Sequence, residues 1–290
     1  MSSNDIERAI LELFETDPTF VAYDREIRYR LEAKYAHDEV GKAVSRLTDK
    51  GLLLRTNLPG RKGRGEHPNI FYRRPGTDYC SQLDPMRRKL ELSTFISGIA
   101  PEMGRHGELA WWRAFRRSTL WSVFPESEEQ VGGVRSYGNA TTTLQNDLDF
   151  IAVRNDITYG VEVKNGLSYP DDLYFKFVVA VELDTIPLVV ARWLNPAQVH
   201  LIKELGGEYL TYRDALYSTT FAKLITDVRD LLGFPIEARD DIDDNYFNRK
   251  TNEIRQRVEA NIAVSKILLK GFLQRSQTNR SIRRTLGDKT

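Results

Sequence analysis

The sequence has few of the residues that several common kinds of site require. It holds one cysteine, Cys80, and four histidines among 290 residues. One cysteine excludes an intrachain disulfide, and without a histidine pattern beside it we expect Cys80 to be a small buried residue rather than a nucleophile. No apolar run is long enough to span a bilayer and no basic-then-apolar segment begins the chain, so we expect a cytoplasmic protein with no membrane partner.

Internal repeats and low-complexity segments are also lacking, and the net charge of +1 indicates little about partners. Hydrophobic residues make up 41% of the chain, which is enough for ordinary cores, and the length allows two domains. From the patterns below we expect a small first domain over residues 1–78, a larger domain over 79–235, and a linker and tail over 236–290.

The first 78 residues predict three helices followed by a hairpin. Apolar residues at helical spacing begin at Ile6, Asp24 can cap a second helix, and Gly51 can end a third. A basic loop, Pro59-Gly60-Arg61-Lys62-Gly63-Arg64-Gly65, separates the two expected strands. The expected helices are residues 6–14, 24–31 and 37–50, and the expected strands are 52–57 and 69–73.

This order resembles the winged helix-turn-helix family over the whole segment. The resemblance implies a small α+β domain that binds DNA, with its third helix in a major groove and its loop on the backbone. The residues it implies as contacts are Lys42, Ser45, Arg46 and Lys50 on the helix and Arg55, Arg61, Lys62 and Arg64 in the hairpin. The alternative is a protein-binding domain with solvated charges, and Asp38, Glu39 and Asp49 count against a strongly basic face.

The most informative stretch is Asn146–Asn165, NDLDFIAVRNDITYGVEVKN. It predicts two strands, residues 148–153 and 157–164, joined by a turn at Arg154-Asn155-Asp156. Side chains alternate along a strand, so Glu162 and Lys164 are expected on one face and Val161 and Val163 on the other. Asp147 and Asp149 are expected to share a face, with Leu148, Phe150 and Ala152 pointing away.

If the acidic faces coincide, the hairpin brings Asp149, Glu162 and Lys164 together over an apolar backing. Two carboxylates and an ammonium are suited to a hard cation and a phosphate. A Glu-x-Lys pair alone is usually a solvated ion pair, but these charges lie between apolar runs in mid-strand. Glu108 is a further acid, expected in the first turn of a helix over residues 108–120, where the helix dipole alone would also favour it.

Other segments complete the expected α/β order. A helix over residues 85–97 is expected to end at a break, Met103–Gly107, before the helix that carries Glu108. Residues 121–124 are expected to form a strand and 125–144 an irregular loop. The remaining expected elements are helix 171–183, strand 186–191, helix 196–205, strand 208–211, a mostly helical 213–232, an acidic linker 237–244 and a basic helical tail.

The succession of Glu108, Asp149 and Glu162-Val163-Lys164 resembles the PD-(D/E)XK nuclease superfamily, whose restriction-endonuclease-like fold includes archaeal Holliday-junction resolvases. The resemblance covers roughly residues 100 to 215 and implies an α/β domain with a mixed sheet flanked by helices. It implies Mg²⁺ or Mn²⁺ held by Asp149, Glu162 and the carbonyl of Val163. Glu108 would hold a second metal or a metal-bound water, and Lys164 would orient or deprotonate the attacking water.

The sequence departs from that family because no proline precedes the aspartate, and Asn146-Asp147-Leu148-Asp149 leaves open which aspartate is the ligand. We prefer Asp149, which lies deeper in the strand, with Asp147 as a supporting partner. Lys176 is a candidate contact for the DNA backbone or, like Asp147, a supporting residue of the site, although a solvated lysine is as good an interpretation.

The tail from Asn245 onward has a net charge of +8 and an apolar helical stripe, so it could dock on the body, dimerise or meet nucleic acid. We expect docking, and we expect the last dozen residues to be disordered. Two functions follow as hypotheses. One is a Mg-dependent DNA endonuclease guided by its first domain, possible as a homodimer. The other is a DNA-binding regulator whose nuclease-like domain is only a scaffold.

Overall fold

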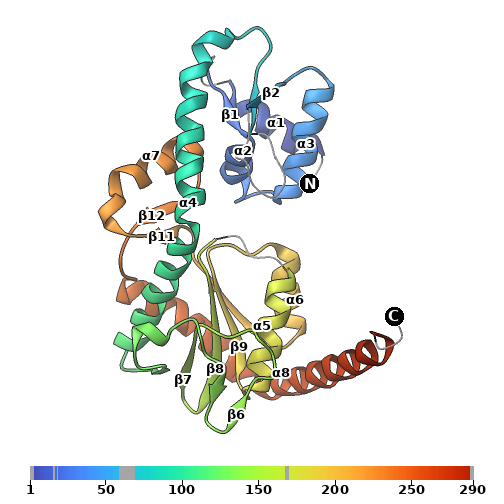
Figure 1. Ribbon diagram of the computed structural model, residues 1–290, viewed down its shortest axis with the longest axis vertical. Coiled ribbons are helices and arrows are strands. Elements are labelled where there is room, and N and C mark those ends of the chain that lie inside the picture. The colour runs from blue at the N-terminus through green and yellow to red at the C-terminus, as the bar shows by residue number, and fades with distance from the viewer. Residues whose placement is uncertain (1–2, 16, 18, 59–68, 167–169, 288–290) are drawn as a thin grey trace. The chain divides into compact units, whose positions relative to one another are not determined.

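The computed structural model describes residues 3–15, 17, 19–58, 69–166 and 170–287. For residues 3, 170–172, 259–261, 273 and 276–287 it describes the backbone alone. The chain forms two compact units (Figure 1), unit 1 from residues 1–100 with 220–238 and unit 2 from 101–219 with 239–290. This division differs from the three consecutive segments expected, because residues 220–238 join the N-terminal unit.

Unit 1 contains the three predicted helices and a three-stranded antiparallel sheet in the order β1-β3-β2. The predicted helices and both predicted strands of this segment are confirmed. The basic loop with Arg61, Lys62 and Arg64 lies outside the described residues. The elements are α1 (Ser3–Leu13), β1 (Ala22–Tyr23), α2 (Asp24–Leu31), α3 (His37–Asp49), β2 (Leu54–Leu58) and β3 (Asn69–Arg73).

A buried ion pair fixes the first part of α4 (Tyr79–Arg117) within unit 1. Lys89 Nζ lies 2.6 Å from Glu26 Oε2, and neither side chain is more than 7% exposed. Lys89 also donates to the carbonyl of Val21, so its charge is satisfied from two sides as burial requires. Later in the chain, α7 (Ala222–Leu232) joins unit 1 through Arg30, which donates to the carbonyl of Asp230 at 2.9 Å.

Unit 2 is built on a five-stranded mixed sheet in the order β10-β9-β8-β7-β4. Strands β8, β9 and β10 are parallel, whereas β7 is antiparallel to both β8 and β4. The predicted strands are confirmed in number and order. Their bounds are β4 (Ser122–Phe124), β7 (Phe150–Arg154), β8 (Ile157–Lys164), β9 (Ile186–Ala191) and β10 (Glu208–Thr211).

Helices cover both faces of this sheet, as the burial of its strands requires. On one face, the second part of α4 and the first part of α8 (Asp244–Gly287) pack on Phe150, Val161 and Val163. On the other face, α5 (Pro170–Glu182) packs on Ile151 and Val189, with α6 (Pro196–Glu204) beside it (Figure 1). The chain is therefore mixed α/β, with a mixed sheet flanked by helices.

The predicted break at Met103–Gly107 is wrong, because α4 is continuous through it. Two glycines cost a helix only about 1 kcal/mol each, and the packing around Gly107 explains its presence. A Cβ atom on Gly107 would lie 2.5 Å from Asn165 Cγ. Consequently Glu108 lies in mid-helix rather than in a first turn, and the helix dipole does not account for it.

Three other expectations need correction. Residues 213–232 include β11 (Ala215–Tyr217), whose three side chains are all buried, and the 3₁₀ turn Thr219–Phe221 before α7 begins. Cys80 is exposed near the start of α4. The tail, whose last dozen residues were expected to be disordered, is helical to Gly287.

Shorter elements fill the remaining loops. The loop after β4 contains the 3₁₀ turn Glu128–Gln130, β5 (Ser136–Tyr137) and β6 (Ala140–Thr141), and β12 (Ile236–Ala238) follows α7. Over the described ranges, no helix combines the length and apolar character that crossing a membrane requires.

Gly107 provides a test of this packing. Asn165 cannot yield, because its Nδ2 donates to Met103 and Leu216 carbonyls and its Oδ1 accepts from Leu216 N–H and Tyr212. Gly107→Ala is therefore expected to lower the free energy of unfolding of unit 2 by about 1–3 kcal/mol. Urea denaturation followed by tryptophan fluorescence measures this.

The matched control is Gly104→Ala on the same helix. Nothing lies within 4 Å of the position of its added Cβ. It should instead stabilise by up to about 1 kcal/mol through helix propensity alone. Equal effects of the two substitutions would show that contact with Asn165 is not what requires Gly107.

Candidate functional site

The site is organised by the β7–β8 hairpin. Asn155 and Asp156 have φ values of 51° and 58°, the left-handed backbone that these two residues tolerate in a tight hairpin turn. The turn sets the register, in which Phe150 pairs with Val161 and Arg154 with Ile157. Glu162 and Lys164 therefore lie near the end of β8, on the face that α5 covers, as Gly160 shows by its approach to Ala180.

Asp149 lies at a β-bulge just before β7. Its N–H donates to the carbonyl of Val161 at 3.1 Å, while Phe150 is the strand partner of the same Val161. Two residues thus oppose one, which redirects a side chain. Asp149 Oδ2 accepts the N–H of Val163 at 2.5 Å, and Asp149 is only 4% exposed.

Because of the bulge, the side chains of the first strand do not alternate between the two faces as expected. Phe150 and Ala152 lie in the core under α4, but Leu148 packs with Ile151 on the α5 face. The prediction that these three side chains share a face is wrong for Leu148. A bulge shifts the two-residue period by one position, and nothing in the hydrophobic pattern marks it.

Glu162 is held between two lysines. Its Oε1 lies 2.7 Å from Lys164 Nζ, and its Oε2 lies 3.0 Å from Lys176 Nζ on α5. Among the described residues, Oε2 has no hydrogen-bond partner, so the contact with Lys176 is an ion pair without hydrogen-bond geometry. The side chain is 4% exposed, which makes this oxygen an incompletely satisfied buried charge.

Lys176 contacts Asp147 as well as Glu162. Its Nζ lies 3.2 Å from Asp147 Oδ1. Asp147 is partly exposed, whereas Asp149 is buried beside Val163. The two aspartates therefore occupy different environments. Asp147 is paired with Lys176, whereas Asp149 interacts with Glu162 and Glu108.

Glu108 extends from the middle of α4 toward Asp149. A Cβ on Gly132 would lie 3.2 Å from Glu108 Oε2 and 4.0 Å from Asp149 Oδ1, so one backbone position borders both acids. Gly132 has a φ of 82° and its N–H donates to the carbonyl of Asp149. Arg105 Nη1 lies 3.3 Å from Glu108 Oε2 and compensates part of its charge.

The charges on these residues are strongly coupled. Burial, followed by the charges of Glu162 and Glu108, raises the pKa of Asp149 well above its usual range. Burial lowers the pKa of Lys164 and of Lys176, but the nearby carboxylates, Glu162 foremost, outweigh it and raise both. The carboxylates thus repel one another while the lysines stay protonated at neutral pH.

Two contributors escaped the sequence analysis. Arg105 lies in the segment that was expected to be a break, and Gly132 lies in a loop without a motif. Lys176 was considered as a contact for the DNA backbone and as a supporting residue of the site, and it pairs with Glu162 and Asp147. A sequence shows no signal for partners that only the packing of α4 and α5 brings to the hairpin.

On α3, two of the four expected DNA contacts are engaged within unit 1. Arg46 Nε and Lys50 Nζ lie 2.8 Å and 2.6 Å from the carboxylate of Glu7, and their hydrogen bonds lower the pKa of Glu7. Ser45 is exposed and donates to the carbonyl of Gly41. Lys42 is exposed and has no ion-pair partner in the described part of the chain.

Comparison with known proteins adds no assignment: no protein-family model matches the sequence, and no curated protein matches it. Within the described ranges, no group of three or more His, Cys, Asp or Glu side chains is arranged to hold a metal ion. The function therefore has to be argued from the residues themselves.

Proposed function

We propose that the chain is a metal-dependent DNA endonuclease that hydrolyses phosphodiester bonds. The observation that carries this proposal is the convergence of Asp149, Glu162 and Glu108 with Lys164 at one end of a mixed sheet. The order of these residues and strands agrees with the PD-(D/E)XK resemblance in the sequence. The buried Asp149 is coupled to Glu162 and Glu108, which raise its pKa together with burial, and groups perturbed in this way are typical of functional sites.

The donor types suit Mg²⁺ or Mn²⁺, although the three acids are not arranged as a metal site while Glu162 pairs with Lys164 and Lys176. All three acids offer oxygen, the ligand type these ions prefer, and one buried oxygen of Glu162 lacks a hydrogen bond. Asp149, Glu162, Glu108 and the carbonyl of Val163 would hold the ion. When bound, it would act as a Lewis acid that neutralises charge on the scissile phosphate and the leaving oxygen.

Lys164 has a role that its position beside Glu162 supports. It lies 2.7 Å from Glu162, where it would orient or deprotonate the attacking water and stabilise developing negative charge. Lys176 is 15% exposed and lies behind Glu162, where it positions that carboxylate. Asp147 in turn holds Lys176.

Delivery to DNA is assigned to unit 1. Three helices followed by a hairpin, with the β1-β3-β2 sheet order, support the winged-helix interpretation of this unit. Its third helix would enter a major groove. Because Glu7 pairs with Arg46 and Lys50, phosphates would have to displace Glu7 from these two cations, whereas Lys42 needs no such exchange.

The test is a cleavage assay on supercoiled, linear and four-way-junction DNA with Mg²⁺, Mn²⁺ or EDTA. Metal-dependent cutting is expected for the wild type, and Glu162→Gln or Lys164→Ala should each slow it by about a hundredfold or more. Glu204→Gln, an exposed acid on α6, is the control and should cut normally. Wild-type protein that cuts none of the substrates would contradict the proposal.

A DNA-binding regulator is the second candidate, and the ion pairs favour it. Glu162 is already neutralised by two lysines and Glu108 by Arg105, so these two acids are compensated without any ion. This function predicts DNA binding of equal strength with Mg²⁺ and with EDTA, no cleavage, and no metal-induced rise in Tm.

A further inference from the structure

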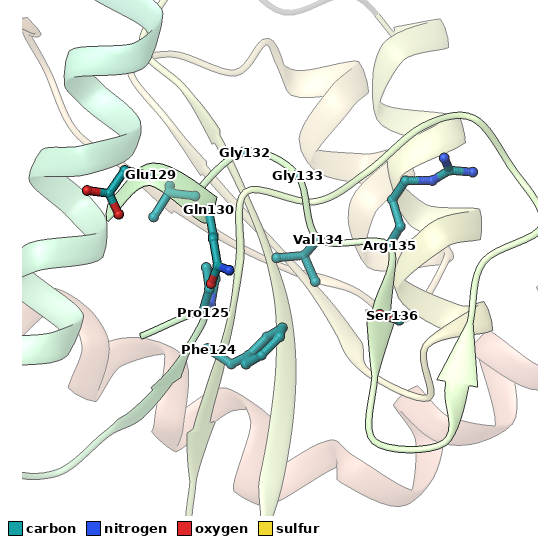
Figure 2. A pocket seen from close by; sticks show the side chains of 10 residues that line it. Phe124, Pro125, Glu129, Gln130, Gly132, Gly133, Val134, Arg135 and Ser136 are labelled. Atoms are coloured by element: carbon teal, nitrogen blue, oxygen red, sulfur yellow. The ribbon is translucent and has the colours of Figure 1, made fainter. Parts of the chain in front are cut away.

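A pocket borders the acidic site on the side of the loop after β4 (Figure 2). It has a volume of about 520 Å³, within the range of small-molecule sites. Figure 2 shows Phe124, Gln130 and Val134 turned toward a common space, whereas Glu129 and Arg135 point outward. Val131 and Val134 are buried and supply an apolar floor, while the Phe124 side chain is 42% exposed.

Two arginines from α4 hold the wall of this pocket in place. Arg105 donates to the carbonyls of Val131 and Glu128 at 2.5 Å and 2.6 Å. Arg113 makes a bidentate pair with the Glu128 carboxylate, at 2.7 Å for each bond. The loop is therefore fixed before any ligand arrives, which lowers the entropy cost of binding.

Gly132 connects the pocket with the acids. It lines the pocket, and its backbone borders both Glu108 and Asp149. A side chain at this position would come within 3.2 Å of both Arg105 Nη1 and Glu108 Oε2. A ligand in the pocket would therefore be separated from the acidic site by a single glycine.

We propose that the pocket receives an unpaired nucleobase of a DNA strand whose adjoining phosphate lies at the acidic site. This rests on the proposed function and specifies its substrate as DNA with an unpaired nucleotide. Phe124 offers an exposed aromatic edge and face for stacking, which every base can use. Tyr137 braces that ring at 5.8 Å between centroids, and the Gln130 amide offers both a donor and an acceptor to a base edge.

Binding is measured by fluorescence anisotropy in EDTA, so that no cleavage is required. The probes are a duplex with one unpaired nucleotide, the same duplex fully paired, and the same duplex with an abasic residue at the unpaired position. The wild type should bind the unpaired base about tenfold more tightly than the other two probes. Phe124→Ala should bind all three alike, and Phe124→Tyr should restore the preference.

Phe221→Ala is the matched control, because Phe221 is similarly exposed (39%) and does not line the pocket. Thermal melting of each variant reports whether it folds. Equal binding of all three probes by the wild type would contradict the proposal that the pocket receives a base. Cleavage of paired DNA in that case would still support the proposed endonuclease activity. Absence of DNA binding overturns both.

Discussion

Replacing Asp149 by asparagine is expected to slow metal-dependent cleavage by about a hundredfold or more without weakening the fold. The asparagine side chain keeps an oxygen that can accept the N–H of Val163, as Asp149 Oδ2 does. It removes the negative charge that a divalent ion requires, and loss of one preorganised charged group typically costs this much in rate. It also relieves repulsion from Glu162 and Glu108, so the Tm in EDTA should not fall.

Asp147→Asn is the matched control two residues earlier. Asp147 is paired with Lys176, so replacing Asp147 should alter the position of that lysine. It should reduce the cleavage rate far less than replacing Asp149 does. A further measurement is the rise in Tm on adding Mg²⁺, which follows from binding to the native state alone. That rise should disappear in the Asp149 variant and persist in the Asp147 variant; the reverse pattern would make Asp147 the ligand.

The Asp149→Asn substitution should therefore lower the cleavage rate without lowering the stability. Buried like charges cost stability, and a site that retains them sacrifices stability for function. If both quantities fell together, Asp149 would be a structural residue whose charge is needed for folding. That result would favour the regulator over the endonuclease.

The sequence predicted the sheet of unit 2 well because its strands are marked by composition. Ile186–Ala191 is a continuous apolar run, and all six of its side chains are buried. Asn155 and Asp156 marked the turn by their tolerance of left-handed backbone. Local signals of this kind are sufficient for element type and order.

The site was predicted only in part, because its geometry depends on contacts distant in sequence. The β-bulge at Asp149, the arginine and glycine beside Glu108, and the pairing of Lys176 with Glu162 leave no periodic trace. The continuity of α4 was missed for a similar reason. Gly107 suggested a break, but its contact with Asn165, far along the chain, determines why glycine is there.

Phe115→Ala is expected to have the largest effect on stability, lowering the free energy of unfolding of unit 2 by about 3–5 kcal/mol. Phe115 is fully buried. Its ring contacts the rings of Trp121, Phe150 and Phe247 at centroid distances of 4.9, 5.4 and 4.8 Å. Truncation removes these aromatic contacts and leaves a cavity at the junction of α4, α8 and the sheet.

Tryptophan fluorescence during urea denaturation isolates this effect, because all four tryptophans of the chain belong to unit 2. Leu120→Ala is the control, since Leu120 is 51% exposed and should change stability by less than about 0.5 kcal/mol. Phe115→Leu keeps most of the volume and should fall between the two variants. A loss below about 1 kcal/mol for Phe115→Ala would mean that the aromatic cluster does not hold α4 on the sheet.

Phe115 is also expected to affect the proposed cleavage activity, because it lies on the same helix as Glu108. Glu108 precedes Phe115 by seven residues, about two helical turns, so both side chains lie on one side of the helix. The aromatic cluster therefore sets the position of Glu108 against Asp149. Phe115→Leu, if it remains folded, should reduce the cleavage rate more than Leu120→Ala, because a small shift of α4 displaces a charged group at the reaction centre. Equal rates in these two variants would show that Glu108 is positioned by Arg105 and not by the core.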